Sequence, residues 1–593
     1  MGKLIVRLLA VIGSLTILTL VVLVAFGLIA AAARGRVPSK AILEVNLETG
    51  LIEDVPDDAF ARTMLSGTPT VRDVVDALDR ASGDDRVAGM VARIGGSAIG
   101  LAQAQEIRDA VRNFRAHKKF AVAWSETFGE VGQGTGSYYL ATAFDEIWMQ
   151  PSGDIGLTGV MLQSQFLRGA FDKLAIVPRM DHRYEYKNAM NMFTERQFTP
   201  PHREAMARLA ESWSSQMVRG IAEGRKLAPA EVRALIDRGP FLGQEALGTH
   251  LVDGLAYRDD VYAKVKERAG RDAKLIYLSR YLDRAGRPHQ SGKSIALIFG
   301  VGGVHRGRSG FSPMFGSASM GSDTVSAAFR AAIDDRNVKA IIFRIDSPGG
   351  SYVASDAIWR ETVRARKAGK PVIASMGNLA GSGGYFVAMA ADKIVAQPAT
   401  ITGSIGVLGG KMLSTGFWQK LGITFDEVHQ GANATMWSST QDYSPAEWAR
   451  FQAWLDRVYA DFTTKVAEGR RLPRERVHEI AKGRIWTGED AKNLGLVDEL
   501  GGYPQALRLA KLAARIPDSE DVNLRVFPKK KSTLEAVLAR LGGEQPESSE
   551  RDAALVEALR TIQPLARQVR AVAGGVETLE MPEFAERVRG PLQ

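Results

Sequence analysis

The apolar residues of this chain follow two patterns that alternate along most of its length. Short β-branched runs such as SIALIFGV, VKAIIFRI, KPVIASM and DKIVAQP are typical of buried strands. The stretch SYVASDAIWRETVRARKAG, which lies between two of these runs, has helical spacing and a basic end. Strands separated by helices predict βαβ units, which build a parallel sheet through right-handed crossovers.

One apolar run is different in kind, because residues 8–33 carry no charge over 26 positions. This length is enough for a helix that spans a bilayer. A cleavable signal peptide is the alternative, since AAAAR offers small residues for cleavage, but the run exceeds the usual apolar core of such peptides. We therefore expect a single transmembrane anchor that contacts membrane lipid. The short, positive N-terminus predicts that the rest of the chain is extracytoplasmic.

The chain contains one module written twice. DDRVAGMVARI matches DDRNVKAIIFRI, YYLATAFDEIWMQP matches YFVAMAADKIVAQP, and AEGRKL matches AEGRRL, at an offset that stays between about 245 and 251 residues. We expect four parts: an N-terminal stub with the anchor (1–40), a first half (41–290), a second half (291–515) and a helical C-terminal extension (516–593). The last part is assigned from amphipathic patterns such as KKKSTLEAVLARL.

Composition removes several classes of function. The 593 residues include no cysteine, which excludes thiol catalysis, disulfides and cysteine-bound zinc. The eight histidines are scattered singly, so we expect no metal site, and no motif indicates a cofactor. The net charge of +9 is spread along the chain, so nucleic acid is not an expected partner.

Two glycine-rich segments of the second half are candidates for chemistry. In DSPGGS (346–351), Gly349 and Gly350 follow a predicted strand and can turn backbone N–H groups toward an oxyanion, although a tight turn explains the same residues. In NLAGSGGYFVAMAADKI (378–394), Ser382 lies between a strand and a helix. A serine at such a turn has an exposed hydroxyl, as in the nucleophile elbow of hydrolases, or else it caps the helix.

The repeat helps to decide between these interpretations. In the first half, Ala98 and Ile99 replace the two glycines, and Thr135 replaces Ser382. Residues that only form turns would be needed equally in both copies. Their loss from one copy indicates an active site that is built in the second half.

A nucleophilic serine needs a base, and two residues are candidates. His429 is the histidine after Ser382 that could return to it, but nothing around it marks it as special. Lys187 of the first half aligns with Asn433 and lies among Tyr184, Tyr186, Met190, Met192 and Phe193. A lysine acts as a base only when neutral, which desolvation favours, whereas most lysines are simply solvated.

Together, the anchor, the tandem halves, DSPGG, YKNAM and NLAGSGGYFVAMAADKIVAQPATITGSIGV resemble the long form of the signal peptide peptidase A family, also called protease IV. The resemblance implies an α/β fold made of tandem Clp-protease/crotonase-like repeats. It implies a serine endopeptidase of the bacterial inner membrane, with its catalytic part on the periplasmic side, that digests signal peptides and assembles as a homotetramer.

The resemblance also implies roles for single residues. Ser382 matches the family nucleophile and Lys187 the general base, while Ser404 of TGSIG would orient the lysine. The oxyanion hole would be formed by the N–H of Gly383 and that of Gly349 or Gly350.

Three alternatives stay open at this stage. The first is a Clp-like Ser–His protease that uses His429, and the second is a crotonase-type acyl-CoA enzyme, which shares the glycine loop but needs no nucleophilic serine. The third is a membrane-anchored scaffold with a decayed site. The intact Gly-Ser-Gly-Gly of the second half argues against the scaffold.

Overall fold

The computed structural model describes residues 35–56, 59–65, 67–96, 99–312 and 317–529, together with the isolated residues Gly13 and Leu18. Apart from these two residues, the anchor expected at 8–33 lies outside the described residues, as does the chain after 529. Among the helices that are described, none is long and apolar enough to cross a membrane. The anchor therefore stays a prediction from the sequence.

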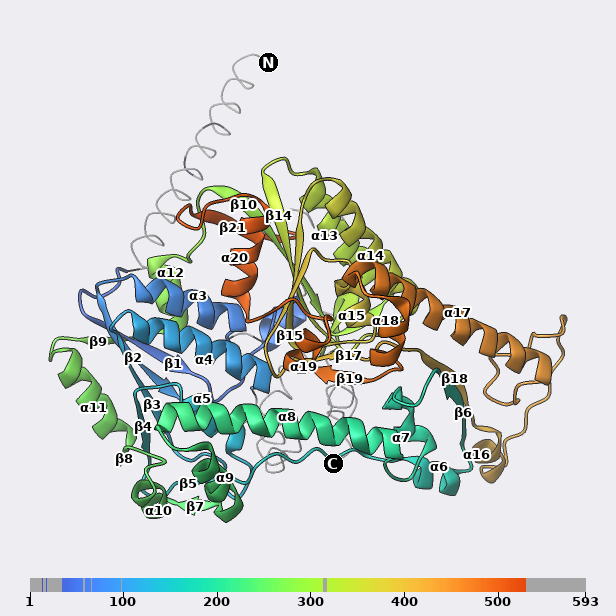
Figure 1. Cartoon of the computed structure of the whole chain (residues 1–593), viewed down its shortest axis with the longest axis horizontal. Coiled ribbons are helices and arrows are strands. Elements are labelled where there is room, and N and C mark those ends of the chain that lie inside the picture. The colour runs from blue at the N-terminus through green and yellow to red at the C-terminus, as the bar shows by residue number, and fades with distance from the viewer. Residues whose placement is uncertain are drawn as a thin grey trace, which may run out of the picture.

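The first half forms one parallel sheet of six strands in the order β8-β4-β3-β2-β1-β9, seen at the left of Figure 1. The strands are β1 (Ala41–Asn46), β2 (Val87–Arg93), β3 (Phe120–Ser125), β4 (Glu146–Met149), β8 (Gly254–Leu255) and β9 (Lys274–Tyr277). Their apolar runs are buried, as expected for a parallel sheet whose faces are covered by other elements.

The second half repeats these pairings in the order β20-β16-β15-β14-β10-β21. Its strands are β10 (Lys293–Val301), β14 (Val338–Ser347), β15 (Val372–Gly381), β16 (Lys393–Ala396), β20 (Glu499–Leu500) and β21 (Val522–Phe527). Two further strands, β17 (Ile401–Gly403) and β19 (Ile485–Thr487), extend the sheet beside β15 and bring it to eight strands. The predicted mixed α/β fold with two tandem halves is confirmed.

The second sheet extends past residue 515, where we expected a helical extension to begin. Residues 522–527 form β21, which pairs in parallel with β10. The sequence VNLRVF is rich in β-branched and apolar residues, and it occupies the edge position that β9 occupies in the first half. This part of the expected extension is therefore a strand that completes the repeat.

Helices cover both sheets, and one hydrophobic cluster spans the two halves. It joins residues of the first half, such as Leu43 and Ile107, to Ile342, Leu379 and Leu507 of the second. The helices of the first half are α2 (Ala59–Met64), α3 (Val71–Ser82), α4 (Leu101–Ala116), α5 (Thr135–Ala141), α6 (Arg168–Leu174), η1 (Asn188–Met190), α7 (Asn191–Thr194), α8 (Pro200–Arg225), α9 (Pro229–Arg238), α10 (Gly243–Gly248), α11 (Arg258–Ala269) and α12 (Leu278–Ala285). Those of the second half are α13 (Ser322–Asp334), α14 (Tyr352–Lys367), α15 (Gly383–Ala388), α16 (Thr415–Lys420), α17 (Pro445–Arg470), α18 (Arg474–Ile480), α19 (Gly488–Asn493) and α20 (Tyr503–Ala513).

The long helices α8 and α17 show that the repeat preserves local structure. Each begins with a Ser or Thr cap followed by proline and ends at a residue in the left-handed conformation. The caps are Thr199 and Ser444, whose side chains accept backbone N–H groups of the first turn, and the final residues are Lys226 and Arg471. The sequence therefore fixes both ends of each long helix locally.

Helix α8 extends from the first half to the second, running horizontally across the lower part of Figure 1. The Trp213 indole donates to the carbonyl of Ala399 at 3.0 Å, and Arg208 pairs with Asp490 at 2.6 Å. Beyond it, β6 (Val177–His182) pairs antiparallel with β18 (Leu408–Leu413) of the second half. The segment that follows β6, which contains Lys187, is thereby placed against the second half. Smaller strands are β5 (Asp154–Ile155), β7 (Phe241–Leu242), β11 (Gly303–His305), β12 (Gly310–Ser312) and β13 (Ser317–Gly321).

Candidate active site

Ser382 lies at the turn where β15 ends and α15 begins, as the sequence predicts. Its backbone has φ 52° and ψ −117°, a conformation that L-residues rarely adopt. The Ser382 hydroxyl makes no capping bond to the helix, so the helix-cap interpretation does not account for it. Strained residues of this kind persist where the surrounding structure imposes them and are enriched at active sites.

The DSPGG loop packs directly against this turn. Gly349 has φ +99°, and a Cβ built on it would lie 2.5 Å from the backbone N of Gly383 and 2.8 Å from the Ser382 Cβ. A Cβ on Gly383 would in turn lie 3.0 Å from the backbone N of Gly350. No side chain fits at these positions, which explains the paired glycines and their close approach to the serine.

The backbone N–H groups of the two loop glycines differ in their partners. The N–H of Gly349 donates to the Ser347 hydroxyl at 3.2 Å, whereas that of Gly350 has no acceptor among the described residues. Gly383 is the first residue of α15, where an N–H has no intrahelical acceptor. Two N–H groups on adjacent segments are therefore available to a bound oxygen.

Lys187 is buried, with 3% of its surface exposed, between two segments of the second half. Its Nζ donates to the Ser404 hydroxyl at 2.8 Å and to the Ser404 carbonyl at 3.0 Å. A Cβ on Gly406 would lie 3.2 Å from the Lys187 Cδ, and one on Gly483 would lie 2.5 Å from its Cα. The solvated-lysine interpretation is therefore wrong, because the chain encloses this side chain.

Ser404, the partner of Lys187, directly follows a residue that is hydrogen-bonded to Ser382. The Ser382 N–H donates to the carbonyl of Gly403 at 2.9 Å, and Gly381 pairs with Gly403 across β15 and β17. Ser404 itself has φ 51°, another left-handed residue without the freedom of glycine. Lys187 of the first half thus contacts Ser404, the residue that follows the Gly403 acceptor of the Ser382 N–H.

The corresponding residues of the first half form a different arrangement. The hydroxyl of Thr135 is buried and accepts the N–H groups of Thr158 at 3.2 Å and Gly159 at 3.1 Å. Asp154, which aligns with Ser404, accepts the Thr127 hydroxyl. Ala98 lies outside the described residues. Thr135 therefore serves to close a loop in the first half.

His429 lies on an exposed segment of the second half, between α16 and α17. Its side chain is about half exposed, and its Nδ1 lies 3.2 Å from a carboxylate oxygen of Glu427. Among the described residues no group of His, Asp and Glu could hold a metal ion. His429 therefore lacks the burial that Lys187 has.

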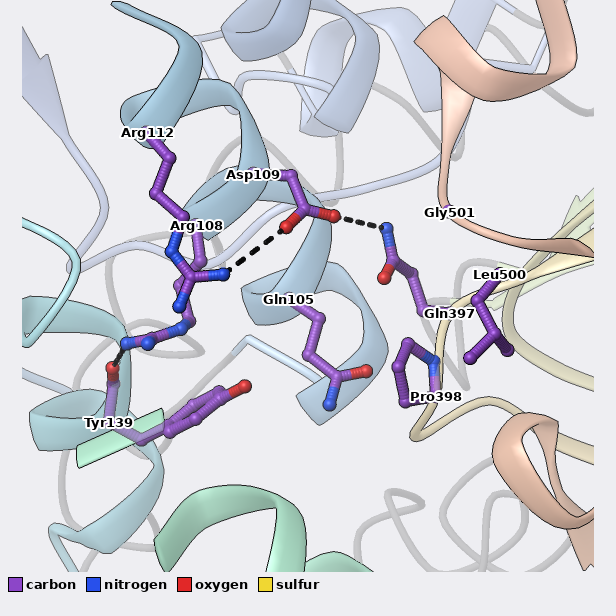
Figure 2. Close-up of a pocket in the computed structure, with 9 residues that line it drawn as sticks. All are labelled: Gln105, Arg108, Asp109, Arg112, Tyr139, Gln397, Pro398, Leu500 and Gly501. Atoms are coloured by element: carbon purple, nitrogen blue, oxygen red, sulfur yellow. Dashed lines mark hydrogen bonds and ion pairs between the residues drawn. The ribbon is translucent and has the colours of Figure 1, made fainter. Parts of the chain in front are cut away.

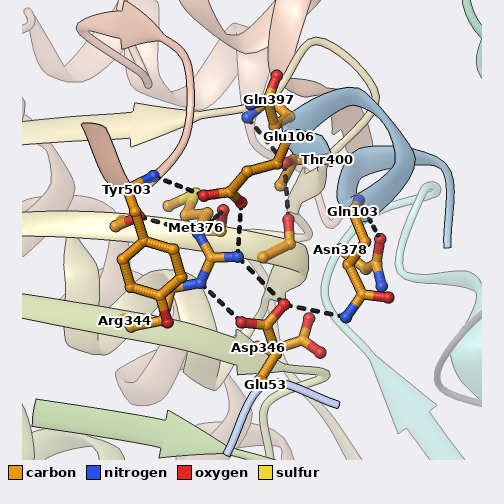
Figure 3. A network of polar contacts seen from close by, with 12 residues as sticks. Glu53, Gln103, Glu106, Arg344, Asp346, Met376, Asn378, Gln397, Thr400 and Tyr503 are labelled. Atoms are coloured by element: carbon orange, nitrogen blue, oxygen red, sulfur yellow. Dashed lines mark hydrogen bonds and ion pairs between the residues drawn. The ribbon is translucent and has the colours of Figure 1, made fainter. Parts of the chain in front are cut away.

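A buried ion network that joins the two halves was not predicted from the sequence (Figure 3). The Arg344 guanidinium, on β14, binds Glu53 at 2.8 Å and Glu106 at 2.8 Å, both from the first half. Asn378 on β15 accepts the backbone N–H of Gln103 at 3.1 Å. Through these bonds the first half holds β14, which leads to the glycine loop, and β15, which leads to Ser382. A signal existed, since both copies of the repeat keep this arginine, as VARI and IFRI.

A cavity of 260 Å³ lies elsewhere, at the seam between the halves (Figure 2). It is lined by residues of α4 and α5 together with Gln397, Pro398, Leu500 and Gly501. Gln397 reaches across the seam and donates to Asp109 at 3.2 Å. None of the predicted site residues lines this cavity, so it is separate from the candidate active site.

Comparisons with known proteins show which family the chain belongs to. The sequence pattern of Peptidase family S49 matches residues 113–272 and 364–516, one match in each half. The chain is 31% identical over 475 residues to the chloroplastic serine protease SPPA of Arabidopsis thaliana, covering 78% of this chain and 68% of the relative. It is 32% identical over 484 residues to Protease 4 of Salmonella typhi, covering 79% and 76%.

A third relative, Protease 4 of Haemophilus influenzae, is 30% identical over 503 residues, covering 80% of this chain and 79% of its own length. A ClpP1 structure from Listeria monocytogenes matches 36% of this chain at 13% identity, with a TM-score of 0.22 that carries no weight for the fold. The chain belongs to peptidase family S49, in the long form with two repeats. It is a serine peptidase.

Proposed function

We propose that this peptidase works through a Ser–Lys dyad shared between its halves, with Ser382 as nucleophile and Lys187 as general base. The observation that supports the proposal is the buried Lys187 amine, which donates to the hydroxyl and the carbonyl of Ser404. The residue before Ser404, Gly403, accepts the backbone N–H of Ser382. A lysine acts as a base only in its neutral form, and burial favours that form over the charged ammonium. The exposed His429 has no comparable setting.

The proposed reaction follows from these positions. Lys187 Nζ takes the proton of the Ser382 hydroxyl, and Oγ attacks the peptide carbonyl carbon. The resulting oxyanion is held by the N–H groups of Gly350 and Gly383, since the N–H of Gly349 already donates to Ser347. The C–N bond breaks as the lysine protonates the leaving amine. A water then attacks the acyl-enzyme while it loses a proton to Lys187, and Lys187 passes this proton to Ser382 Oγ as the ester C–O bond breaks.

The substrates we propose are signal peptides and other apolar segments at the membrane. The relatives named Protease 4 share most of this chain, and residues 8–33 would hold the enzyme where such peptides accumulate. We place it in the bacterial inner membrane with the catalytic part on the periplasmic side, and we expect the fold to be of the Clp-protease/crotonase type. Alkaline extraction and protease accessibility of intact spheroplasts test this placement; release by alkali would contradict it.

We also propose a homo-oligomer, expected to be a tetramer. In the first half, β6 and its following loop lie on the second half, but the equivalent segment between β18 and α17 exposes Leu421, Phe425, Val428 and Trp437. Exposed apolar groups of this kind mark interaction surfaces, and the internal repeat suggests the same docking between neighbouring copies. Analytical ultracentrifugation of the detergent-solubilised chain tests it, and a monomer at micromolar concentration would refute it.

The dyad is tested on the full chain in detergent with a fluorogenic apolar peptide and a fluorophosphonate probe. Ser382→Ala should abolish both turnover and labelling, and Lys187→Ala should reduce turnover by at least about a thousandfold. Lys367→Ala, at an exposed lysine of α14, is the matched control and should behave as wild type. Full activity of both dyad variants would refute the proposal, whereas loss in His429→Ala with an active Lys187→Ala would favour the Ser–His alternative.

A further inference from the structure

The segment that carries Lys187 belongs to the first half but is held by backbone contacts with the second. The N–H of Arg183 donates to the carbonyl of Val407 at 3.0 Å, and that of Tyr186 donates to the carbonyl of Lys482 at 3.1 Å. The position of the amine therefore depends on the turn at Lys482 and Gly483, which lies between α18 and β19.

This turn is strained and lies directly on the lysine. Lys482 has φ +53° and Gly483 has φ +82°, and Tyr184 on the opposing segment has φ +65°. A Cβ on Gly483 would lie 2.5 Å from the N, Cα and Cβ atoms of Lys187. The left-handed backbone conformation of Lys482 and Tyr184 costs free energy because neither residue is glycine, so other contacts must stabilise it.

Tyr459 of α17 supplies contacts to both sides. Its hydroxyl accepts the N–H of Lys482 at 3.3 Å and shares a hydrogen bond of 3.2 Å with Nδ1 of His478. Its ring lies against that of Tyr184, with centroids 4.6 Å apart, and Tyr184 also meets His478 at 4.7 Å. Tyr459 therefore contacts both the segment that carries Lys187 and the turn that covers it.

We propose that Tyr459 is a positioning residue for the base, which fixes Lys187 through the Lys482–Gly483 turn on one side and Tyr184 on the other. The inference rests on the proposed Ser–Lys dyad. Tyr459 is 7% exposed, and burial raises the pKa of its hydroxyl to about 12, so the group keeps its proton at neutral pH. The hydroxyl can then accept from Lys482 while it donates to the histidine.

The variant Tyr459→Phe isolates the hydroxyl, because the ring and its packing on Tyr184 are kept. We expect kcat to fall about tenfold with KM unchanged, since a small displacement of a general base slows the chemical step without weakening substrate binding. The rate of Ser382 labelling by a fluorophosphonate should fall in parallel. Tyr281→Phe is the control, because it also removes a buried tyrosine hydroxyl, one bonded to Asp84 at 3.0 Å in the first half.

The results separate this inference from the dyad itself. Lys187→Ala is measured alongside: if it stays active, the proposed function fails. If Lys187→Ala is inactive while Tyr459→Phe keeps the wild-type kcat, the positioning role is wrong. It is also wrong if the kcat of Tyr459→Phe falls no further than that of Tyr281→Phe when both variants lose equal thermal stability. A fall in kcat that Tyr281→Phe does not share supports it.

A second variant reaches Lys187 from the other side. Gly483→Ala places a methyl group against the Lys187 backbone, so kcat and the labelling rate should fall at least as far as in Tyr459→Phe. Gly369→Ala is the matched control, because Gly369 also has positive φ, at +75°, but a Cβ there meets nothing within 4 Å. Equal kcat in the two glycine variants would overturn the inference that this turn positions the base.

Discussion

The buried network around Arg344 permits a quantitative prediction of how the halves depend on each other. Arg344 is fully buried, and its five N–H groups are used: three bonds reach Glu53 and Glu106, and two reach Ser375 and the carbonyl of Met376. Its side chain also lies against the ring of Tyr503, 4.4 Å from the centroid. The change Arg344→Met keeps much of the volume but removes every one of these donors.

The expected cost follows from what the substitution leaves behind. The side chains of Glu53 and Glu106 are 1% and 2% exposed, so two carboxylates would remain buried without their cation. Breaking one buried pair typically costs about 3–5 kcal/mol, and we expect Arg344→Met to lie at or above the upper end of that range. The control is Arg93→Met, the same position in the other repeat, whose side chain is 23% exposed and pairs with Glu48. A partly solvated pair of this kind should cost about 1 kcal/mol.

The assay is urea unfolding of the full chain in detergent, followed by tryptophan fluorescence, with peptidase activity read in parallel. The triple variant Arg344→Met, Glu53→Gln, Glu106→Gln should regain much of the loss, because neutral amides can remain buried at smaller cost. If Arg344→Met and Arg93→Met shift the unfolding midpoint equally, the reasoning from burial is refuted.

Three further predictions concern the site and the response to pH. Ser404→Ala should lower kcat about tenfold to a hundredfold with KM unchanged, because Lys187 loses its hydroxyl partner; an unchanged kcat in a peptidase assay would contradict that role. Thr135→Ser in a Ser382→Ala background should remain unlabelled by a fluorophosphonate, because the Thr135 hydroxyl is occupied by two N–H groups; labelling would show a second functional site. Burial lowers the pKa of His202 to about 4, so below pH 6.5 the unfolded chain binds a proton that the folded chain does not. Stability should therefore fall between about pH 6.5 and pH 4, by up to about 3 kcal/mol, and His202→Gln should reduce this dependence in pH-resolved thermal melts while His117→Gln, at an exposed site, should not.

The Glu106 carboxyl gives the opposite sign of pH dependence. Burial and the neighbouring Glu53 raise its pKa above the ordinary value, despite the attraction of Arg344. The folded chain thus holds this proton more strongly than the unfolded chain does. The protonated Glu106 carboxyl therefore contributes its full stability when the pH is below the ordinary pKa of a glutamate. This contribution is lost as the pH rises through the raised pKa of Glu106 in the folded chain.

The sequence by itself determined the features that depend on local backbone and on the repeat. It predicted the alternation of strands and helices, the repeated module, the glycine loop and the serine at a strand-to-helix turn. Each of these features depends on consecutive residues and can be compared between the two copies. Ser382 was predicted as the nucleophile in this way, because Thr135 replaces it in the first half. The strand at 522–527 was missed because its place in the sheet depends on pairing with β10, more than two hundred residues earlier.

Only the tertiary structure decided the electrostatic features. The environment of Lys187 follows from the pairing of β6 with β18 and from the turn at Gly483, which bring segments from both halves around one amine. The difference between Gly349 and Gly350 rests on a single hydrogen bond to Ser347. Whether a charged group is solvated or buried depends on long-range packing, and composition or spacing along the chain does not contain that information. The Ser382 turn can therefore be predicted from consecutive residues, whereas the buried setting of Lys187, the proposed base, forms only once the two halves have folded together.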